Sequence, residues 1–190
     1  MPRLPRVLSD ADLPYPELCA ARLDGELARV GEMFCAIDEP DSIVVRATSL
    51  GMSWPHRYIA ERRSAAWVWG ALHSPPTIHD LCASLGARTR PQVGSRVHMR
   101  EVAISEDDIV DIGGLLVTNP LRTVTDLARC ASVSGADATM MMRNLCESFD
   151  ITLDRCQSAL HRKRNLPNIN LARSRLALSF APTATQTLPR

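Results

Sequence analysis

The sequence predicts an α+β protein that has a winged-helix-like module at its amino end, a small, mostly antiparallel sheet with packed helices, and a helical carboxy-terminal region. Three observations lead to this prediction. Strand-like alternation is confined to the first two thirds of the chain, helical apolar periodicity dominates the last third, and glycines and prolines separate the segments. With 190 residues and 45% hydrophobic content, the chain can form one ordinary domain with a small additional module.

The first segment, residues 1–40, is expected to contain a helix and a hairpin. Apolar residues fall at helical spacing over residues 15–24, between a proline and a glycine. Two strand-like runs follow, Leu27–Val30 and Met33–Ile37, and Gly31 between them permits the positive φ of a tight turn. A helix followed by a hairpin is typical of the end of a winged helix, so we predict a module boundary after residue 40.

Residues 41–179 are expected to form an α/β domain with carboxy-terminal helices. Asp41 or Ser42 can cap a first helix, and a second helix over residues 61–72 ends before two prolines. Strand patterns follow that break, and the last two of them flank a Gly-Gly pair that predicts a hairpin. The expected strands are Thr77–Cys82, Arg96–Ala103, Ile109–Ile112 and Leu115–Thr118.

The last third is expected to be helical and to end in a disordered tail. Asn119 is placed as an N-cap before Pro120, and Ser134 and Thr152 can cap two further helices. The helix after Ser134 carries an amphipathic stripe in which methionines serve as core residues. Residues 180–190 have little apolar surface to bury, so we predict disorder there.

The bulk properties exclude several classes of protein. The longest apolar runs are too short to cross a bilayer, and the amino terminus lacks the apolar core of a signal peptide, so we expect a cytoplasmic protein. The six cysteines are scattered without a CxxC pair, which predicts free thiols. All but one of the 22 basic residues are arginine, a bias that we attribute to a GC-rich, actinobacterial genome.

The net charge of +1 conceals charged blocks. Residues 1–60 carry a net −3 and residues 61–104 a net +3, whereas 105–150 carry −5 and 151–190 carry +6. A balanced total argues against a dedicated nucleic-acid coat, but local basic patches can still contact phosphate. Ordinary solvated charge is an equally good interpretation of such patches. The candidate nucleic-acid contacts are Arg3, Arg6, Arg22, Arg29, Arg88, Arg90, Arg96 and Arg100.

Two groups of polar residues could carry chemistry, and neither has the required spacing. The potential metal ligands are His73, His79, Cys82 and His98. They match no standard zinc pattern, and on an alternating strand His79 and Cys82 point to opposite faces. The potential nuclease carboxylates are Glu101, Asp107 and Asp108, which are followed by no ExK-like triplet. We therefore expect no catalytic residue, metal, cofactor or small-molecule substrate.

Two motifs stand out, and we interpret both as structural. In RSAAWVWG, residues 63–70, small side chains beside two tryptophans on one helix indicate close packing. In TNPLRTVTDLAR, residues 118–129, Arg122, Asp126 and Arg129 are spaced so that their charges can pair along one helix face. The structural residues singled out are Arg63, Ser64, Ala65, Ala66, Trp67, Trp69, Pro120, Arg122 and Asp126.

The order of these motifs resembles a known family. ERRSAAWVWGAL, followed by strands and about fifty residues later by GLLVTNPLRTVTDLARC, is similar to the actinobacterial AbiEi-type antitoxin and transcriptional-regulator family of type IV toxin–antitoxin systems. The resemblance covers roughly residues 13–180. In that family a winged helix precedes an α/β domain, and the stretch LPYPELCAARLDGELARVGEMFCAID is similar to its last helix and wing.

The resemblance implies a non-enzymatic protein that neutralises a nucleotidyltransferase-like toxin and represses its own operon by binding operator DNA. It also implies that the winged-helix-like module is shortened, because few residues precede Leu13. Longer relatives continue into a nuclease-like domain, which we expect this chain to lack because it ends at Arg190. Two alternatives stay open: a DNA-binding transcriptional regulator without a toxin partner, and a degenerate remnant of a nuclease-bearing relative.

Overall fold

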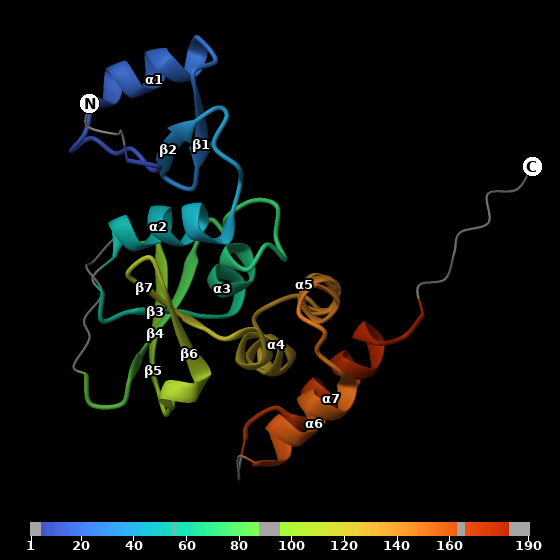
Figure 1. Ribbon diagram of the computed structural model, residues 1–190. Coiled ribbons are helices and arrows are strands. Elements are labelled where there is room, and N and C mark those ends of the chain that lie inside the picture. The colour runs from blue at the N-terminus through green and yellow to red at the C-terminus, as the bar shows by residue number, and fades with distance from the viewer. Residues whose placement is uncertain (1–4, 55, 88–95, 163–165, 183–190) are drawn as a thin grey trace, which may run out of the picture. The chain divides into compact units, whose positions relative to one another are not determined.

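The computed structural model of the protein describes residues 5–54, 56–87, 96–162 and 166–182 (Figure 1). Helices and strands both contribute, so the predicted α+β class is confirmed. The chain divides into two compact units, Met1–Asn119 and Pro120–Arg190. None of the helices in the described parts combines the length and apolar content that a transmembrane span needs. Of the predicted tail, residues 180–190, only positions 183–190 lie outside the described residues.

The first unit begins with the helix and hairpin that the sequence predicts. These are helix α1 (Tyr15–Leu23) and the antiparallel strands β1 (Leu27–Val30) and β2 (Met33–Ala36). An additional β-bridge joins Leu8 to Phe34. Helix and hairpin share a small core centred on Phe34, and Tyr15 packs edge-on against its ring at 6.1 Å. These elements are compatible with part of a winged helix, and the assignment to that fold stays a prediction.

The β1–β2 turn packs directly against the remainder of the unit. Gly31 has a φ of +59°, which glycine adopts without steric cost. A Cβ at this position would lie 2.9 Å from Ser49 Oγ and 3.3 Å from Trp67 Cη2, so glycine is also needed for space. The Ser49 hydroxyl donates a 2.5 Å hydrogen bond to the carbonyl of Val30. The segments before and after residue 40 are therefore packed together and do not have independent cores. The division of the chain into two functional modules at residue 40 stays a prediction.

Helices and a mixed sheet form the rest of the first unit (Figure 1). Ser42 caps the first of these helices through a bond from Val45 N–H to its hydroxyl, as predicted. The elements are α2 (Ile43–Ser53), β3 (Ile59–Ala60), α3 (Arg62–Val68), β4 (His79–Ser84), β5 (Val97–Val102), the 3-10 turn η1 (Glu106–Asp108), β6 (Ile109–Ile112) and β7 (Leu115–Thr118).

The sheet has the strand order β5-β4-β3-β7-β6. β3 pairs antiparallel with β4, and β6 with β7, whereas β3–β7 and β4–β5 are parallel. The hairpin at Gly113-Gly114 is confirmed, and both glycines have positive φ. The sequence predicts a mostly antiparallel sheet, but this sheet is mixed because β4 and β5, successive in the chain, run in the same direction. Parallel neighbours need a crossover connection, which strand periodicity does not reveal.

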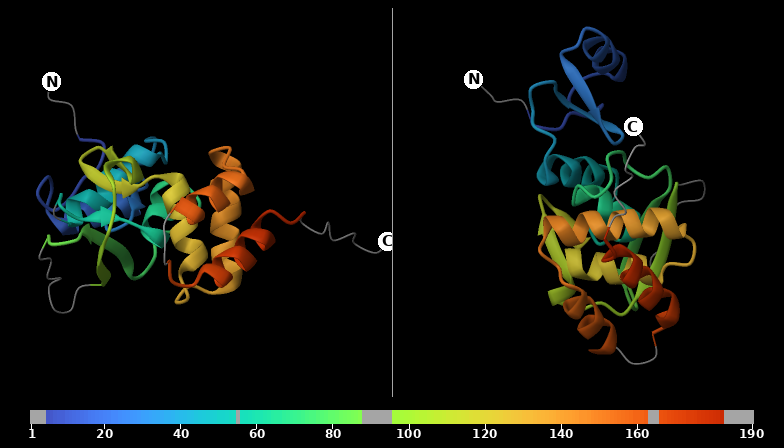
Figure 2. Two further views of the ribbon diagram at one scale, coloured as in Figure 1. Left: turned by 90° about the horizontal axis from the view of Figure 1, so that it is seen from below. Right: turned by 90° about the vertical axis from the view of Figure 1, so that its right-hand side faces the viewer.

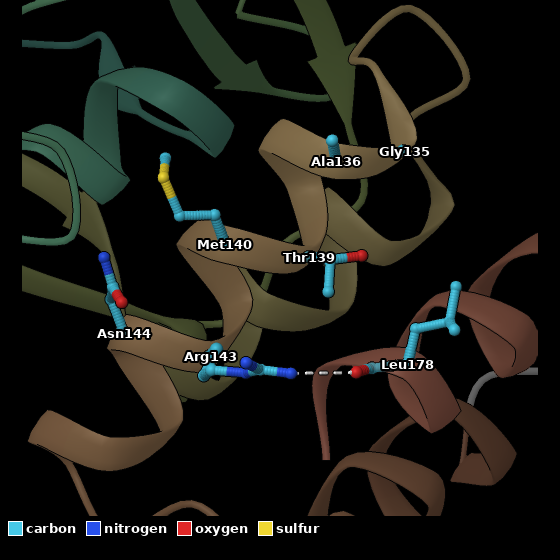
Figure 3. A pocket seen from close by; sticks show the side chains of 7 residues that line it. All are labelled: Gly135, Ala136, Thr139, Met140, Arg143, Asn144 and Leu178. Carbon is cyan, nitrogen blue, oxygen red and sulfur yellow. Dashed lines mark hydrogen bonds between the residues drawn. The ribbon is translucent and has the colours of Figure 1, made fainter. Parts of the chain in front are cut away.

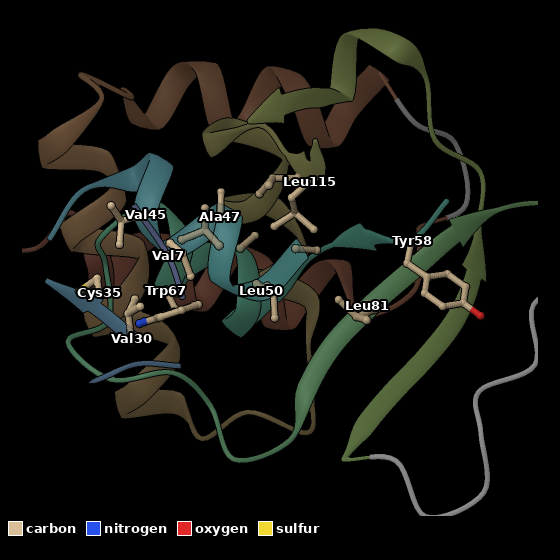
Figure 4. Packing of buried hydrophobic residues seen from close by; sticks show 14 of the residues in the cluster. Val7, Val30, Cys35, Val45, Ala47, Leu50, Tyr58, Trp67, Leu81 and Leu115 are labelled. Atoms are coloured by element: carbon tan, nitrogen blue, oxygen red, sulfur yellow. The ribbon is translucent and has the colours of Figure 1, made fainter. Parts of the chain in front are cut away.

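One apolar core joins the helices of the first unit to its sheet (Figure 4). α2 contacts β6 and β7, and α3 contacts β4 and β7. Trp67 of α3 and Leu50 of α2 are both almost fully buried in this cluster, together with Leu81 and Leu115 of the sheet. The tryptophan helix is therefore a packing element, as the sequence predicts.

In the described part of the second unit, three helices pack around a fourth, α4. Helix α4 contacts the other three, and its residues Arg122–Ala128 are all buried. Ser134 accepts a 3.1 Å bond from Asp137 N–H and Thr152 a 3.3 Å bond from Arg155 N–H, which confirms both predicted caps. The helices are α4 (Pro120–Arg129), α5 (Gly135–Ser148), α6 (Leu153–Arg162) and α7 (Ile169–Ser179). All six cysteines are free thiols, as predicted.

Candidate functional site

The residues that begin the RSAAWVWG helix form a buried cluster of charges in the first unit. Glu61, directly before α3, is 1% exposed, and its two carboxylate oxygens accept 2.5 Å hydrogen bonds from Nε and Nη2 of Arg100 on β5. Arg62 lies 3.8 Å from the same carboxylate. The Glu61 N–H donates to the carbonyl of Asp80, which brings a second buried carboxylate close. Arg100, a candidate phosphate contact, is therefore held by an internal partner.

Asp80 on β4 is the second centre of this cluster. Its Oδ2 and Oδ1 accept hydrogen bonds of 2.7 and 3.2 Å from Nε and Nη2 of Arg63, and His98 Nδ1 lies 3.5 Å from Oδ1. The Ser64 hydroxyl accepts a 2.9 Å bond from Asp80 N–H and lies 3.1 Å from His79 Nδ1. The polar residues Arg63 and Ser64 of the motif thus connect α3 to strand β4.

His79 gives this cluster a pH dependence that can be measured. Burial lowers the pKa of His79 below the ordinary value of 6.5, and Arg63 acts in the same direction, against the opposing effects of Glu32 and Asp80. The unfolded chain therefore takes up a proton at a higher pH than the folded chain does. The stabilisation that neutral His79 contributes is therefore fully present above the pKa that His79 has in the unfolded chain. It is lost as the pH falls through the lower pKa that His79 has in the folded chain.

We expect the urea-derived free energy of unfolding to fall between about pH 7 and pH 5 more steeply in the wild type than in a His79→Asn variant. Asparagine keeps a polar group near Ser64 but does not titrate. Urea unfolding followed by circular dichroism at each pH gives the free energy of unfolding of the wild type and of the variant as two curves against pH. If the curves stay parallel over this range, His79 does not contribute in this way.

The apolar part of the motif is packed as predicted. Ala65 and Ala66 are completely buried, and Trp67 is 3% exposed. Trp69 is half-buried, and its indole Nε1 donates a 2.8 Å bond to the carbonyl of Thr118 on β7. These contacts give both alanines and both tryptophans of the motif a structural role within the first unit.

Sequence reasoning missed the arginine that supports this helix from α2. Arg46 is buried, donates to both Asp41 oxygens, and gives its Nη1 to the carbonyls of Trp67 and Leu72 at 2.8 and 2.9 Å. Its guanidinium also lies 5.9 Å from the centre of the Trp67 ring. Hydrogen bonding from Arg46 lowers the pKa of Asp41. The carbonyl partners lie more than twenty positions away in the sequence, so no local signal marks them.

The second motif forms a buried ion-pair triad in the second unit. Asp126 on α4 accepts a 2.8 Å bond from Arg122 Nε on one oxygen and a 2.5 Å bond from Arg129 Nη2 on the other. The aspartate side chain is fully buried, and the two arginine side chains are 7% and 12% exposed. The helix begins at Pro120, as predicted. The charges pair along one helix face, as the sequence indicates, and they are held away from solvent.

Two further arginines of this unit bind backbone carbonyls, and no local sequence pattern indicates either role. Arg175 on α7 donates to the carbonyls of Leu127, Cys130 and Val133, near the end of α4, at 2.6 to 3.2 Å. Arg143 on α5 donates to three carbonyls at the end of α7, at 3.1 to 3.2 Å. Orphan carbonyls at helix ends are thereby satisfied, and the four-helix unit is joined by arginine side chains.

The arginines proposed for phosphate binding do not form one described site. Arg6 lies 3.7 Å from Glu39, and Arg29 pairs with Glu32 at 3.2 Å and lies over the Phe34 ring. Three others are outside the described residues: Arg3, Arg88 and Arg90. Two are exposed: Arg22 on α1 and Arg96 before β5. Their role in binding nucleic acid stays a prediction.

The residues considered for metal binding and nuclease chemistry are dispersed. No group of three or more His, Cys, Asp or Glu side chains in the described parts of the chain could hold a metal ion. His79 contacts Ser64, His98 contacts Asp80, and Cys82 is buried in an apolar cluster. Glu101 and Asp107 are exposed.

A surface groove of about 510 Å³ runs along α5 and α7 of the second unit (Figure 3). Met140 and Leu178 line it with side chains that are 46% and 59% exposed. Arg143 crosses from α5 to the Leu178 carbonyl at 3.2 Å, so a hydrogen bond holds the two sides of the groove together. The other lining residues are Gly135, Ala136, Thr139 and Asn144. This groove presents apolar side chains on a rigid support, which suits contact with another protein.

Comparisons with known proteins place both motifs in one family segment. The model of the AbiEi antitoxin C-terminal domain matches residues 58–176, from the residue before β3 to the last turns of α7. No curated protein matches the chain. The crystal structure of the RV2827C protein from Mycobacterium tuberculosis is similar in fold, with a TM-score of 0.51 and 18% identity over 94% of this chain and 73% of that one.

The family model spans more than half of the chain and includes the charged cluster of the first unit, the ion-pair triad and helix α5, whereas the groove residue Leu178 follows the matched segment. The resemblance inferred from the two motifs is therefore confirmed. The chain belongs to the AbiEi antitoxin C-terminal domain family.

Proposed function

We propose that this chain neutralises a nucleotidyltransferase-like toxin by binding it directly, without catalysing a reaction. The observation that carries the proposal is the match of residues 58–176 to an antitoxin domain. The family supports an antitoxin or regulatory role, and the identity of the toxin and the mode of neutralisation are our proposal.

The buried carboxylates of the family segment support binding rather than catalysis. Both oxygens of Glu61, Asp80 and Asp126 already accept hydrogen bonds from arginine guanidinium groups. A general base needs an oxygen within reach of a substrate proton, and these oxygens are directed at internal partners. Such charge pairs fix the positions of helices and strands, which gives a binding surface a defined shape.

The groove of α5 and α7 is where we place the toxin contact. Its exposed Met140 and Leu178 are apolar groups that gain stability when a partner covers them. The groove needs little rearrangement on binding because Arg143 connects its two helices. Pre-ordered contact surfaces lose less conformational entropy on association.

Glutamates at both groove positions are expected to abolish co-purification with the product of the adjacent toxin gene. A Met140→Glu/Leu178→Glu variant would bury two carboxylates without partners at the interface, which strongly weakens binding. The matched control is Leu23→Glu/Leu85→Glu, since these side chains of the first unit are even more exposed at 81% and 65%. Retained toxin binding by the groove variant, or equal loss in the control, contradicts the placement.

A second candidate role, repression of the operon, is favoured by the helix and hairpin of residues 15–36. A shift assay with the upstream sequence tests it, because affinity that depends on phosphate contacts falls steeply with salt. Binding of DNA without any toxin gene nearby would support a regulator that has no toxin partner.

A further inference from the structure

Two thiols of the second unit contact each other where α5 ends and α6 begins. Cys146 lies in the last turn of α5, and Cys156 lies in the first turn of α6. Their side chains form a hydrogen bond in which the Cys146 thiol is the donor. Neither residue lines the groove in which we place the toxin contact. The pair therefore has no part in the function proposed above.

The connection between the two helices fixes this contact. The Ile151 N–H donates a 3.0 Å bond to the carbonyl of Cys146, and the Cys156 N–H donates a 3.2 Å bond to the carbonyl of Thr152. Helices α5 and α6 both pack against α4 in the same unit (Figure 2). The two sulfur atoms are therefore held near each other by backbone bonds on both sides of the connection.

The pair is shielded from solvent. Cys156 is fully buried, and Cys146 is 7% exposed. A bulky oxidant such as oxidised glutathione must bring its own sulfur into contact with the attacking thiolate, and burial prevents that approach. Hydrogen peroxide is close to water in size. The surroundings of the pair therefore favour an oxidant of the peroxide class.

The two thiols differ in how easily they lose a proton. The hydrogen bond from Cys146 lowers the pKa of Cys156, and the charge of Arg155 acts in the same direction, against the effect of burial. The same hydrogen bond raises the pKa of Cys146, and burial and Glu147 raise it further. Because the thiolate is the form that attacks peroxides, Cys156 is the nucleophile of the pair and Cys146 is the thiol that reacts second.

Two other buried cysteines have different surroundings. Cys130, also in the second unit, lies 3.2 Å from the hydroxyl of Ser132. Burial raises the pKa of Cys35 in the first unit, and the charges of Glu39 and Asp41 raise it further. Cys130 therefore has a hydroxyl neighbour where Cys156 has a thiol, and the surroundings of Cys35 disfavour its thiolate.

We propose that Cys146 and Cys156 form a reversible oxidation site at which hydrogen peroxide converts the two thiols into a disulfide. The link joins the carboxy end of α5, the helix that carries the groove residues Met140 and Arg143, to the start of α6. The proposal is independent of the proposed toxin binding, because it depends only on the contact between the two thiols.

The reaction has two steps. The Cys156 thiolate attacks one oxygen of the peroxide, the O–O bond breaks, and a sulfenic acid forms while the released hydroxide takes up the proton that Cys156 lost. The Cys146 sulfur then attacks the sulfenic sulfur, so that the S–S bond forms, and the hydroxyl leaves as water with the Cys146 proton. In total the two thiols give two electrons and two protons to one peroxide, which becomes two waters. A dithiol reductant reverses the change.

Peptide mass mapping without reductant tests the proposal on the folded full chain after treatment with hydrogen peroxide. Trypsin separates the two cysteines because Arg155 lies between them, so they are found in peptides 144–155 and 156–162. We expect these peptides to be joined, with a mass about 2 Da below their sum, and to separate again in dithiothreitol. The proposal is overturned if both thiols stay reduced, or if they become sulfinic acids without being linked.

Two single variants separate the roles of the two sulfurs. In Cys146→Ser the second thiol is missing, so we expect Cys156 to accumulate a sulfenic acid that dimedone traps. In Cys156→Ser we expect much less trapping at Cys146, because its pKa is raised. Equal trapping in both variants would overturn the assignment of Cys156 as the nucleophile.

The matched control is Cys130→Ser, which removes another buried thiol of the same unit. We expect this variant to form the link between Cys146 and Cys156 as the wild type does. Loss of the link in the control as well would mean that the oxidation does not depend on this pair, and the proposal would fail. Circular dichroism establishes that each variant is folded, and the wild-type peptide map decides the main claim without any variant.

Discussion

Replacing Asp126 with asparagine is expected to lower the free energy of unfolding by about 3–5 kcal/mol. The aspartate side chain is fully buried and is the only carboxylate that bonds to both Arg122 and Arg129 within the described residues. Asparagine preserves the shape but removes the buried negative charge that both guanidinium groups bond to, and that loss is more costly than the loss of a surface pair. Urea unfolding followed by circular dichroism measures the change.

Asp24→Asn provides the control for this prediction. Asp24 is exposed at the end of α1, so its removal should change stability by less than about 0.5 kcal/mol. If the Asp126 variant behaves like this control, the triad does not stabilise the second unit.

Replacing Trp67 with alanine is expected to have a similar effect, about 3–5 kcal/mol of lost stability. Its ring fills the space between the Gly31 turn and the sheet and supports the Arg46 guanidinium. Truncation leaves a cavity and removes that contact, and the α2–α3 packing that surrounds it cannot collapse without breaking the Arg46 bonds to Trp67 and Leu72 carbonyls. Thermal and urea unfolding both report the loss.

Trp69→Phe separates the effect of ring packing from that of a hydrogen bond. It removes the 2.8 Å bond from Nε1 to the Thr118 carbonyl but keeps an aromatic ring. We therefore expect the free energy of unfolding to fall by about 1 kcal/mol. Equal effects of the two tryptophan substitutions would contradict the assignment of Trp67 as the central packing residue.

Local features of the fold could be predicted from the sequence because their causes are local. Ser42, Ser134 and Thr152 were identified as caps from residue type and position, and each accepts the expected backbone bond. The Gly113-Gly114 hairpin and the burial of Ala65, Ala66 and Trp67 follow equally from short-range pattern.

Features that depend on distant contacts could not be predicted in this way. The parallel pairing of β4 with β5 depends on a connection that leads the chain back to the same end of the sheet. The periodicity of the strand residues does not encode the path of that connection. Arg46, Arg143 and Arg175 look like surface residues in the sequence, yet each donates to backbone carbonyls more than twenty positions away. The sequence predicts a phosphate contact at Arg100, and this prediction misses the buried partner Glu61 because that residue lies 39 positions earlier.

The functional inference came from the order of two motifs rather than from any catalytic residue. RSAAWVWG and TNPLRTVTDLAR identified the antitoxin family, and the family match over residues 58–176 includes both. The structure explains their composition through packing and internal ion pairs. Each motif therefore has a structural role within its own unit.

Relief of growth arrest tests the central claim most directly. A gene for the nucleotidyltransferase-like toxin that we propose as the partner is induced in cells that also express the full chain, its groove variant Met140→Glu/Leu178→Glu, or the control Leu23→Glu/Leu85→Glu. Direct neutralisation predicts that the wild type and the control restore growth and the groove variant does not, with equal protein levels in all three. If the wild type leaves the arrest unchanged, the chain does not act as an antitoxin toward that toxin.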